Sequence, residues 1–215
     1  MDTVMSLVEF RNQLTKKLAS VGLAEEKVRP FVCTGSPLSC DIMMVGYNPS
    51  RDMELATFDA RIWDDNTGFD REHFVELYDF AGHQQGENRW SRNHIFQQNL
   101  IDELPDYAVL ETYLYSMITP KKSLVPTLHR NTEIFDWLVK VVQPKLIITQ
   151  NSEVRRYFER VTTKILKRNE FNAVMYQAQP CVILPISHLS KKWTFAEIAA
   201  LRESVLTFLE MLEDV

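Results

Sequence analysis

Short apolar runs alternate along this chain with segments in which apolar residues recur at helical spacing. Residues 42–45, 146–149 and 182–184 are almost wholly apolar, which is typical of strands buried on both faces. Residues 110–118 and 173–176 are rich in Tyr, Thr and Val, which favour strands. These patterns predict a largely buried sheet.

Helical spacing predicts helices around and between these runs. Thr194 and Glu197 stand three residues apart at the start of the last one, which is the spacing of a capping box. The predicted helices are residues 5–23, residues 70–79, a segment from Ser91 or Asn93 to about 103, residues 133–142, residues 152–167, and a segment that begins at Thr194.

The alternation of strands and helices predicts an α/β protein with three layers, α/β/α, around a central four-stranded, mainly parallel sheet. A length of 215 residues fits one such domain. We therefore expect a single domain over residues 1–215. It would carry an N-terminal helix at about 5–23 and a long insertion, about 51–105, after the first strand.

The composition is ordinary for a soluble globular protein, with 45% hydrophobic and 25% charged residues. No apolar stretch approaches the roughly 20 residues that cross a bilayer, and residues 1–6 lack the features of a signal peptide. We therefore expect a cytoplasmic protein with no membrane partner. We also expect a monomer, because no long exposed apolar stripe stands out.

Two features of the composition restrict the chemistry. Three cysteines are too few for a disulfide framework or a four-cysteine metal site, so buried thiols are predicted. A net charge of −5 argues against a nucleic-acid surface that covers the whole protein. Basic residues cluster only locally, at Lys121 and Lys122, at residues 164–168, and at Lys191 and Lys192.

The common catalytic and nucleotide-binding motifs are missing. The chain has no P-loop, no G-x-G-x-x-G fingerprint, no G-x-S-x-G elbow and no H-E-x-x-H. The five histidines do not pair at metal-ligand spacing. We therefore predict no metal and no cofactor, and a nucleotide-dependent oxidoreductase is disfavoured.

Polar residues follow two of the predicted strands directly. Gly46-Tyr-Asn-Pro-Ser50 follows the first, and Ser187-His-Leu-Ser190 follows the last. Ligands in open α/β sheets bind beyond the carboxyl ends of the strands. Asn48 and His188 are therefore expected to face one cleft.

These two segments, in this order and on strands, resemble the motifs of the uracil-DNA glycosylase superfamily. Gly46-Tyr-Asn-Pro49 resembles its first motif in the asparagine form, and His188-Leu-Ser190 resembles its second motif with leucine in place of proline. Residues 144–158 are similar to the family's third strand and the helix after it. The resemblance spans about 42–209 and implies a uracil-DNA glycosylase-like fold.

The resemblance also implies a reaction, hydrolysis of the N-glycosidic bond of a uracil-type, deaminated or damaged base in DNA during base-excision repair. Asn48 would position the attacking water, and His188 would stabilise the leaving base. The implied substrate contacts in the first loop are Gly46, Tyr47, Pro49 and Ser50. Phe58 and Trp63 are candidates for stacking on the base, and Ser116 stands at the base-reading position. The implied DNA contacts are Ser190, Lys191, Lys192, Lys121 and Lys122.

Each of these residues also has a purely structural interpretation. Asn48 is a common turn residue before proline, and His188 fits a loop histidine bonded to backbone. Phe58 and Trp63 fit core packing, and Ser116 fits a buried strand hydroxyl that lacks the two-sided amide of a base reader. A second hypothesis therefore stays open: an inactive or divergent member of the same fold that binds a nucleotide, a nucleic acid or a protein partner.

Overall fold

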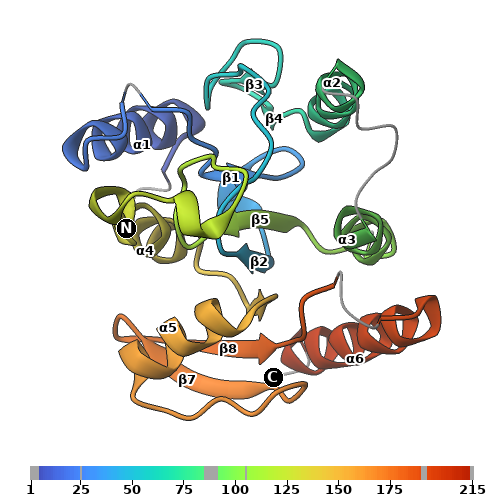
Figure 1. The fold of residues 1–215 in the computed structure, drawn as a ribbon. Helices are drawn as coiled ribbons and strands as arrows, with labels where there is room; N and C mark the ends of the chain where they lie inside the picture. The colour runs from blue at the N-terminus through green and yellow to red at the C-terminus, as the bar shows by residue number, and fades with distance from the viewer. Residues whose placement is uncertain (1–4, 25, 85–91, 105, 190–192, 214–215) are drawn as a thin grey trace.

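The computed structural model describes residues 5–24, 26–84, 92–104, 106–189 and 193–213. A six-stranded sheet in the order β1-β5-β2-β6-β8-β7 forms the centre of the molecule (Figure 1). Its four inner strands run parallel to one another. They are β5 (Val109–Tyr113), β2 (Ile42–Gly46), β6 (Leu146–Thr149) and β8 (Gln179–Pro185).

The α/β class and the mainly parallel sheet are confirmed, but the predicted number of four strands is wrong. The two further strands lie at the edges, β1 (Phe31–Val32) and β7 (Asn172–Tyr176), and both run antiparallel to their neighbours. Of the two, only β7 lies in a segment with a predicted strand pattern. β1 lies outside the segments for which the sequence predicts a strand. With two residues, it is too short to show a period-2 pattern.

Side chains of the inner strands alternate between two cores, as the pleat requires. In β2, Met43 and Val45 join one core, and Ile42 and Met44 join the other. In β6, Ile147 belongs to the first core and Ile148 to the second. Both faces of the sheet are therefore covered, and this explains why the strands are apolar throughout.

Three helices cover the first face: α1 (Leu7–Ser20), α4 (Glu133–Val142) and α5 (Ser152–Thr162). Each buries an apolar stripe at helical spacing, and in α1 the stripe is Phe10, Leu14 and Leu18. α3 (Arg92–Asp102) and α6 (Phe195–Glu213) cover the second face (Figure 1). The α6 capping box is present, since the Glu197 amide donates to Thr194 Oγ1 at 3.2 Å and the Thr194 amide donates to the Glu197 carboxylate at 2.7 Å.

The segment between β2 and β5 is a long insertion, as predicted. It contains a short hairpin, β3 (Trp63–Asp64) and β4 (Gly68–Phe69), followed by α2 (Arg71–Gln84). Gly68 has a φ of +92°, and a Cβ there would lie 2.3 Å from the Gly35 carbonyl oxygen. Only glycine lets the hairpin approach the segment after β1 so closely.

Two predicted boundaries move. α5 ends at Thr162, because Thr163 takes the left-handed conformation with φ of 53°. β5 ends at Tyr113 rather than near 118. Within the described ranges, no helix combines the length and the apolar character that crossing a membrane would require.

Candidate functional site

The strand order creates a crevice at the carboxyl end of β2. The chain passes from β2 to β5 on one side, and then returns to β6 on the other side. Such a reversal is a topological switch point, where the connections leave the sheet in opposite directions and open a crevice. Gly46, the last residue of β2, lies at this point.

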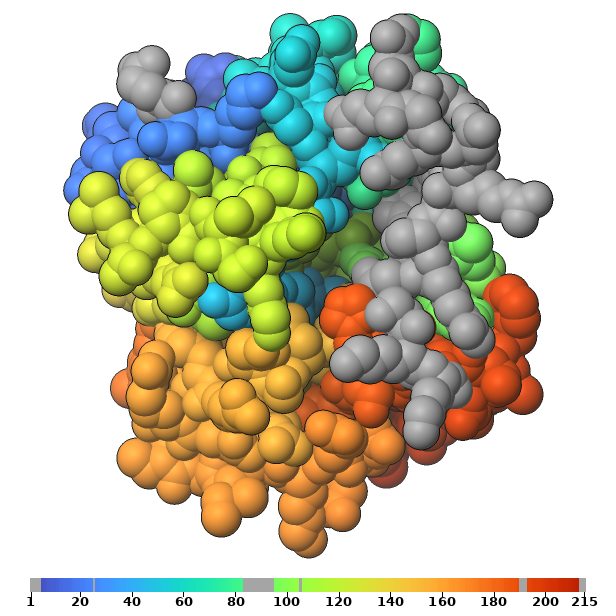
Figure 2. Space-filling view, viewed as in Figure 1, coloured from blue at the N-terminus to red at the C-terminus, as the bar shows by residue number. Residues whose placement is uncertain are grey.

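A cleft of about 730 Å³ occupies the crevice. Residues at the carboxyl ends of all four parallel strands line it: Gly46 to Asn48 after β2, Thr112 and Tyr113 in β5, Gln150 to Ser152 after β6, and Ile186 to His188 after β8. Figure 2 shows the surface hollowed near its centre, between the yellow-green segment before α4 and the orange segment of α5. The cleft therefore brings together the two segments that the sequence singled out.

Asn48 is held in one orientation by its amide nitrogen. Nδ2 donates to the Pro49 carbonyl at 2.8 Å, to the Thr119 carbonyl at 3.0 Å and to Thr119 Oγ1 at 2.9 Å. Two of these acceptors are carbonyl oxygens, so the nitrogen and not the oxygen must face them. The Asn48 Oδ1 accepts no hydrogen bond from the described residues, and it remains as a directed acceptor.

Thr119 supports this arrangement from beneath. It is 6% exposed, its amide donates to the Pro49 carbonyl at 3.0 Å, and its hydroxyl donates to the Lys121 carbonyl at 3.0 Å. With its proton committed to Lys121, the hydroxyl can only accept from Asn48. The sequence analysis missed Thr119, because nothing in the pattern links residues 71 positions apart.

Gly46 permits a close approach of β5 beside the motif. A Cβ at this position would lie 3.0 Å from Cδ1 of the Tyr113 ring. Tyr113 lines the cleft, and burial raises the pKa of its hydroxyl to about 12. Tyr47, next to Gly46, packs edge-on against Tyr115 with the ring centroids 5.0 Å apart. Aromatic rings therefore flank the Asn48 loop.

His188 lines the same cleft from the far side, two residues after Ile186. The chain is fixed there because the Ile186 amide donates to the Thr149 carbonyl at 2.9 Å, and because Trp193 Nε1 donates to the Ser187 carbonyl at 3.1 Å. Leu189, which stands where the resemblance expects proline, is fully buried in the second core. The backbone beside His188 is thus anchored by packing.

A buried ion pair forms another part of the cleft wall. Arg71 in α2 and Glu111 in β5 are in contact, and are only 9% and 7% exposed. Gln97 in α3 also donates to Glu111, and Gln98 accepts from Arg71 at 2.9 Å. Both charges are compensated, as burial demands. Because the pair joins α2 and α3 to β5, it fixes the insertion against the sheet.

The charges around the cleft are mainly positive, although the chain has a net charge of −5. Among the described lining residues, Arg29, Arg71, Lys122 and Arg168 are cationic, and Glu111 and Glu153 are acidic. Glu153 forms an ion pair with Lys122, which lowers the pKa of the Glu153 carboxyl. The local balance fits an anionic ligand better than the overall composition does.

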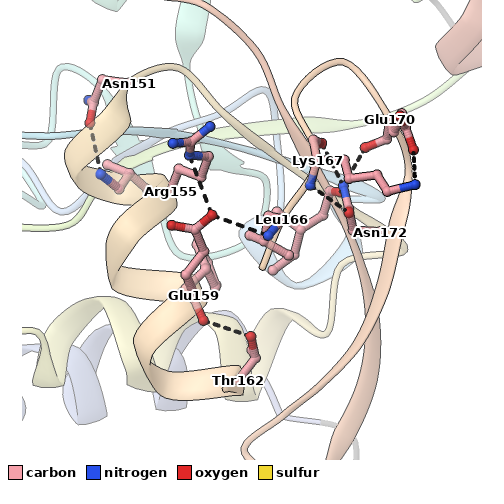
Figure 3. A network of polar contacts seen from close by, with 11 residues as sticks. Asn151, Arg155, Glu159, Thr162, Leu166, Lys167, Glu170 and Asn172 are labelled. Atoms are coloured by element: carbon pink, nitrogen blue, oxygen red, sulfur yellow. Dashed lines mark hydrogen bonds and ion pairs between the residues drawn. The ribbon is translucent and has the colours of Figure 1, made fainter. Parts of the chain in front are cut away.

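Arg168 reaches the cleft through a rigid loop between α5 and β7. Figure 3 shows Asn172, the first residue of β7, bonded to Lys167 and Glu170 of this loop. Its Nδ2 donates to the carbonyls of Lys167, Glu170 and Ile183 at 3.0, 2.6 and 3.2 Å, and its Oδ1 accepts from the Lys167 amide at 3.0 Å. At the other end, Asn151 caps α5 by accepting from the Val154 amide at 2.9 Å. These bonds determine where Arg168 lies.

Gln150 is a further lining residue that the sequence analysis missed. It lies between the two motifs, because its amide donates to the Val45 carbonyl at 3.2 Å. The residue is 4% exposed, yet its side chain hydrogen-bonds to none of the described residues. A polar residue directly after a buried strand was the available signal. It was passed over because no motif contains it.

Several predicted site residues lie elsewhere. Phe58 and Trp63 do not line the cleft; they pack against each other with centroids 4.8 Å apart, and both rings also contact Phe31 in the first core. The cause is α1, whose Phe10 stacks on Trp63. The structure therefore does not place these rings where a base in the cleft could stack on them, and the described aromatic residues that line the cleft are Tyr47, Phe74, Tyr78 and Tyr113.

Ser116 does not line the cleft either. It lies three residues beyond the end of β5 and is 3% exposed, and its carbonyl accepts from the Arg29 amide at 2.8 Å. The shorter strand places Thr112 and Tyr113 at the cleft instead. A base-reading role for Ser116 is thus not supported.

The remaining predicted residues divide into three groups. Ser50 and Lys122 line the cleft with Gly46, Tyr47, Asn48 and His188. Pro49 is buried beneath the loop, and Lys121 is exposed but does not line the cleft. Ser190, Lys191 and Lys192 lie outside the described residues.

No protein-family model matches the chain, and a search of curated proteins finds no match. In the part of the chain that the structure describes, no three His, Cys, Asp or Glu side chains gather closely enough to hold a metal ion.

Proposed function

We propose that this protein is a DNA glycosylase of the uracil-DNA glycosylase-like type, which hydrolyses the N-glycosidic bond of a deaminated or damaged base. One observation carries the proposal: Asn48, whose oxygen accepts no hydrogen bond from the described residues, and His188 line the same cleft from the carboxyl ends of β2 and β8. The order of strands and helices and the resemblance of the two motifs support the same conclusion.

The Asn48 loop supplies what a water nucleophile needs. Glycosidic cleavage passes through an oxocarbenium-like sugar, and a water must be held beneath the anomeric carbon. Asn48 Oδ1 can accept a hydrogen bond from that water, because the amide nitrogen is committed to Pro49 and Thr119. An amide is not a base, so it orients the water and stabilises the cationic sugar by its dipole.

Stabilisation of the leaving base makes the larger contribution to lowering the barrier. As the bond breaks, negative charge accumulates on the base, and a hydrogen-bond donor at an exocyclic oxygen lowers the barrier. His188 lines the same cleft as the Asn48 loop and is suited to this role. A preorganised donor of this kind contributes about 10²–10³-fold to the rate.

A base in duplex DNA reaches such a cleft only when it is turned out of the stack. Tyr47 and Tyr78 are half-buried aromatic residues in the lining and offer a stacking surface. Lys122 and Arg168 are exposed at the cleft and fit phosphate contacts, which are mostly made by Lys and Arg. The positive charge at the cleft offsets the overall negative charge of the protein at the place where the DNA strand would bind.

The test is cleavage of single- and double-stranded oligonucleotides that carry uracil, hypoxanthine or xanthine. We expect release of at least one of these bases, and a fall of about 10²–10³-fold with Asn48→Ala and with His188→Ala. His73→Ala is the matched control, because His73 lies on α2 beside Glu76 and not in the cleft. Absence of cleavage on every lesion, or cleavage that neither variant reduces, would exclude the glycosylase.

The second hypothesis, a binding protein of the same fold without catalysis, is favoured by the amide at position 48. None of the described residues of this loop offers a carboxylate to take a proton from water. Under this hypothesis the protein binds a nucleotide or single-stranded DNA, and Lys122→Ala and Arg168→Ala weaken binding although no base is released. Binding without cleavage therefore separates the two functions.

A further inference from the structure

Gln150 differs from the other buried carboxamides of this protein because nothing in the described chain satisfies it. Only 4% of the Gln150 surface is exposed to solvent. Its amide side chain has two donors and two acceptor positions, and none of them bonds to a described residue. Because these groups make no bond inside the described protein, they are left for whatever occupies the cleft.

The backbone leaves Gln150 no freedom to turn away. Thr149 pairs with Val45 on one side and with Pro185 on the other, so Gln150 lies level with Gly46 and Ile186. The bonds from the Gln150 amide to Val45 and from the Ile186 amide to Thr149 lock this register at 3.2 and 2.9 Å. Gln150 is thus fixed between the segment of Asn48 and the segment of His188.

The side-chain amide opens onto the cleft rather than into the core. Among the described residues, the side-chain atoms sealed from solvent without a hydrogen-bond partner include Arg71 Nε, His129 Nδ1, Thr149 Oγ1 and Arg155 Nε. The amide atoms of Gln150 are not among them, although they too have no partner. Since the residue lines the cleft, the cleft is where these atoms meet accessible space.

We infer that Gln150 recognises the nucleobase in this cleft, by pairing its carboxamide with a base edge on which a hydrogen-bond donor and an acceptor stand side by side. A carboxamide matches such an edge with two parallel hydrogen bonds, as the keto and N–H groups of uracil or hypoxanthine present it. The inference rests on the proposed base-binding role of the cleft, and it assigns the reading of the base to β6 instead of to Ser116.

The chemistry of the site favours this ligand over water alone. A site with an unpaired polar group discriminates strongly against ligands that leave the group unpaired, and it rewards those that match it. Asn48, after the neighbouring strand, lines the same cleft. The side-chain oxygens of Asn48 and Gln150 are therefore available as acceptors to one ligand, and the Gln150 NH₂ group is available as a donor. Gln150 is therefore a specificity-determining residue.

The test measures binding of the free base, which does not depend on catalysis. Uracil and hypoxanthine are titrated into ¹⁵N-labelled protein, and the side-chain amide signal of Gln150 is assigned by its loss in Gln150→Met. We expect that signal to shift on binding, and we expect Gln150→Met and Gln150→Glu to raise Kd by about tenfold or more, which is the loss of two hydrogen bonds.

Gln179→Met is the matched control, because Gln179 begins β8 at the end away from the cleft and should leave Kd unchanged. The melting temperature separates binding from folding. Gln150→Met removes an unsatisfied amide and keeps the volume, so the melting temperature should stay or rise while affinity falls. A lower melting temperature with unchanged affinity would show a structural role and would overturn the inference.

The outcomes distinguish this inference from the proposed function. Base binding that needs Gln150, without cleavage of any oligonucleotide, supports the inference and refutes the glycosylase. Cleavage that Gln150→Met leaves unchanged supports the glycosylase and refutes the inference. Failure of the wild-type protein to bind either base refutes the inference directly.

Discussion

Two regions of this molecule use buried carboxamides in opposite ways. In the loop between α5 and β7, Asn172 bonds through both its nitrogen and its oxygen, with four backbone partners. At the cleft, Asn48 uses only its nitrogen, and Gln150 uses neither atom. A fully bonded amide holds the fold together. An amide with open positions is available to a ligand, and the side chains differ in this respect because Asn48 and Gln150 line the cleft whereas Asn172 does not.

The largest effect is expected where all the bonds are internal. Asn172→Ala removes the donor for three carbonyls and the acceptor for one amide, and should lower the free energy of unfolding by about 3 kcal/mol, since each buried group left unpaired is costly. Urea denaturation measures this. Asn99→Ala on α3 is the control, and should change stability by less than about 0.5 kcal/mol. Equal effects at both positions would break the contrast.

A smaller effect is expected at Asp136 in α4, which also bonds within the fold and does not line the cleft. The hydroxyls of Tyr157 and Tyr176 both donate to its carboxylate. Tyr157→Phe should therefore lower the free energy of unfolding at neutral pH by about 1–1.5 kcal/mol. Tyr47→Phe is the control, because the Tyr47 hydroxyl bonds to none of the described residues.

Alkaline pH tests the same cluster. Burial, together with the Asp136 carboxylate, raises the pKa of Tyr157 to about 12. The neutral phenol is favoured in the folded state, so its contribution is complete below the ordinary tyrosine pKa of about 10 and declines as pH rises toward the folded pKa. Wild-type stability should fall between about pH 10 and 12, and Tyr157→Phe should flatten that fall. A parallel decline in the variant would contradict the assignment.

Weakening the bonds of the Asn48 amide should affect stability and cleavage to different extents. Thr119→Val removes the hydroxyl that accepts from Asn48 Nδ2, and should lower the free energy of unfolding by only about 1 kcal/mol. Its effect on cleavage should be larger, about tenfold in kcat, because the water acceptor loses its fixed orientation. Thr127→Val, in the exposed turn η3 (Thr127–His129), is the control for both readouts. Loss of stability without loss of activity would mean that Asn48 has a structural role, like Asn172.

The unbonded amide should show no stability cost at all. Gln150→Met should leave the free energy of unfolding unchanged or raise it by up to about 1 kcal/mol, because the variant buries a thioether in place of an unsatisfied amide. Thermal and urea unfolding of the two proteins measure the difference. A clear loss of stability would mean that Gln150 resembles Asn172, and the contrast between the two regions would disappear.

The sequence by itself determined the α/β class, the inner strands and most of the helices. Apolar runs without alternation occur only where both faces of a strand are buried, and β2 and β6 are such strands. It also identified Asn48 and His188, because a polar residue directly after a buried strand can only lie at the sheet edge where ligands bind.

Only the tertiary structure decided the rest, since hydrogen bonds and packing between distant segments leave no local pattern. The edge strand β1 exists because β5 is there to pair with it. Phe58 and Trp63 are core residues because Phe10 of α1 lies against Trp63 and Phe31 lies against both. Thr119 orients Asn48 across 71 positions, and the register of β6 between β2 and β8 places Gln150 at the cleft.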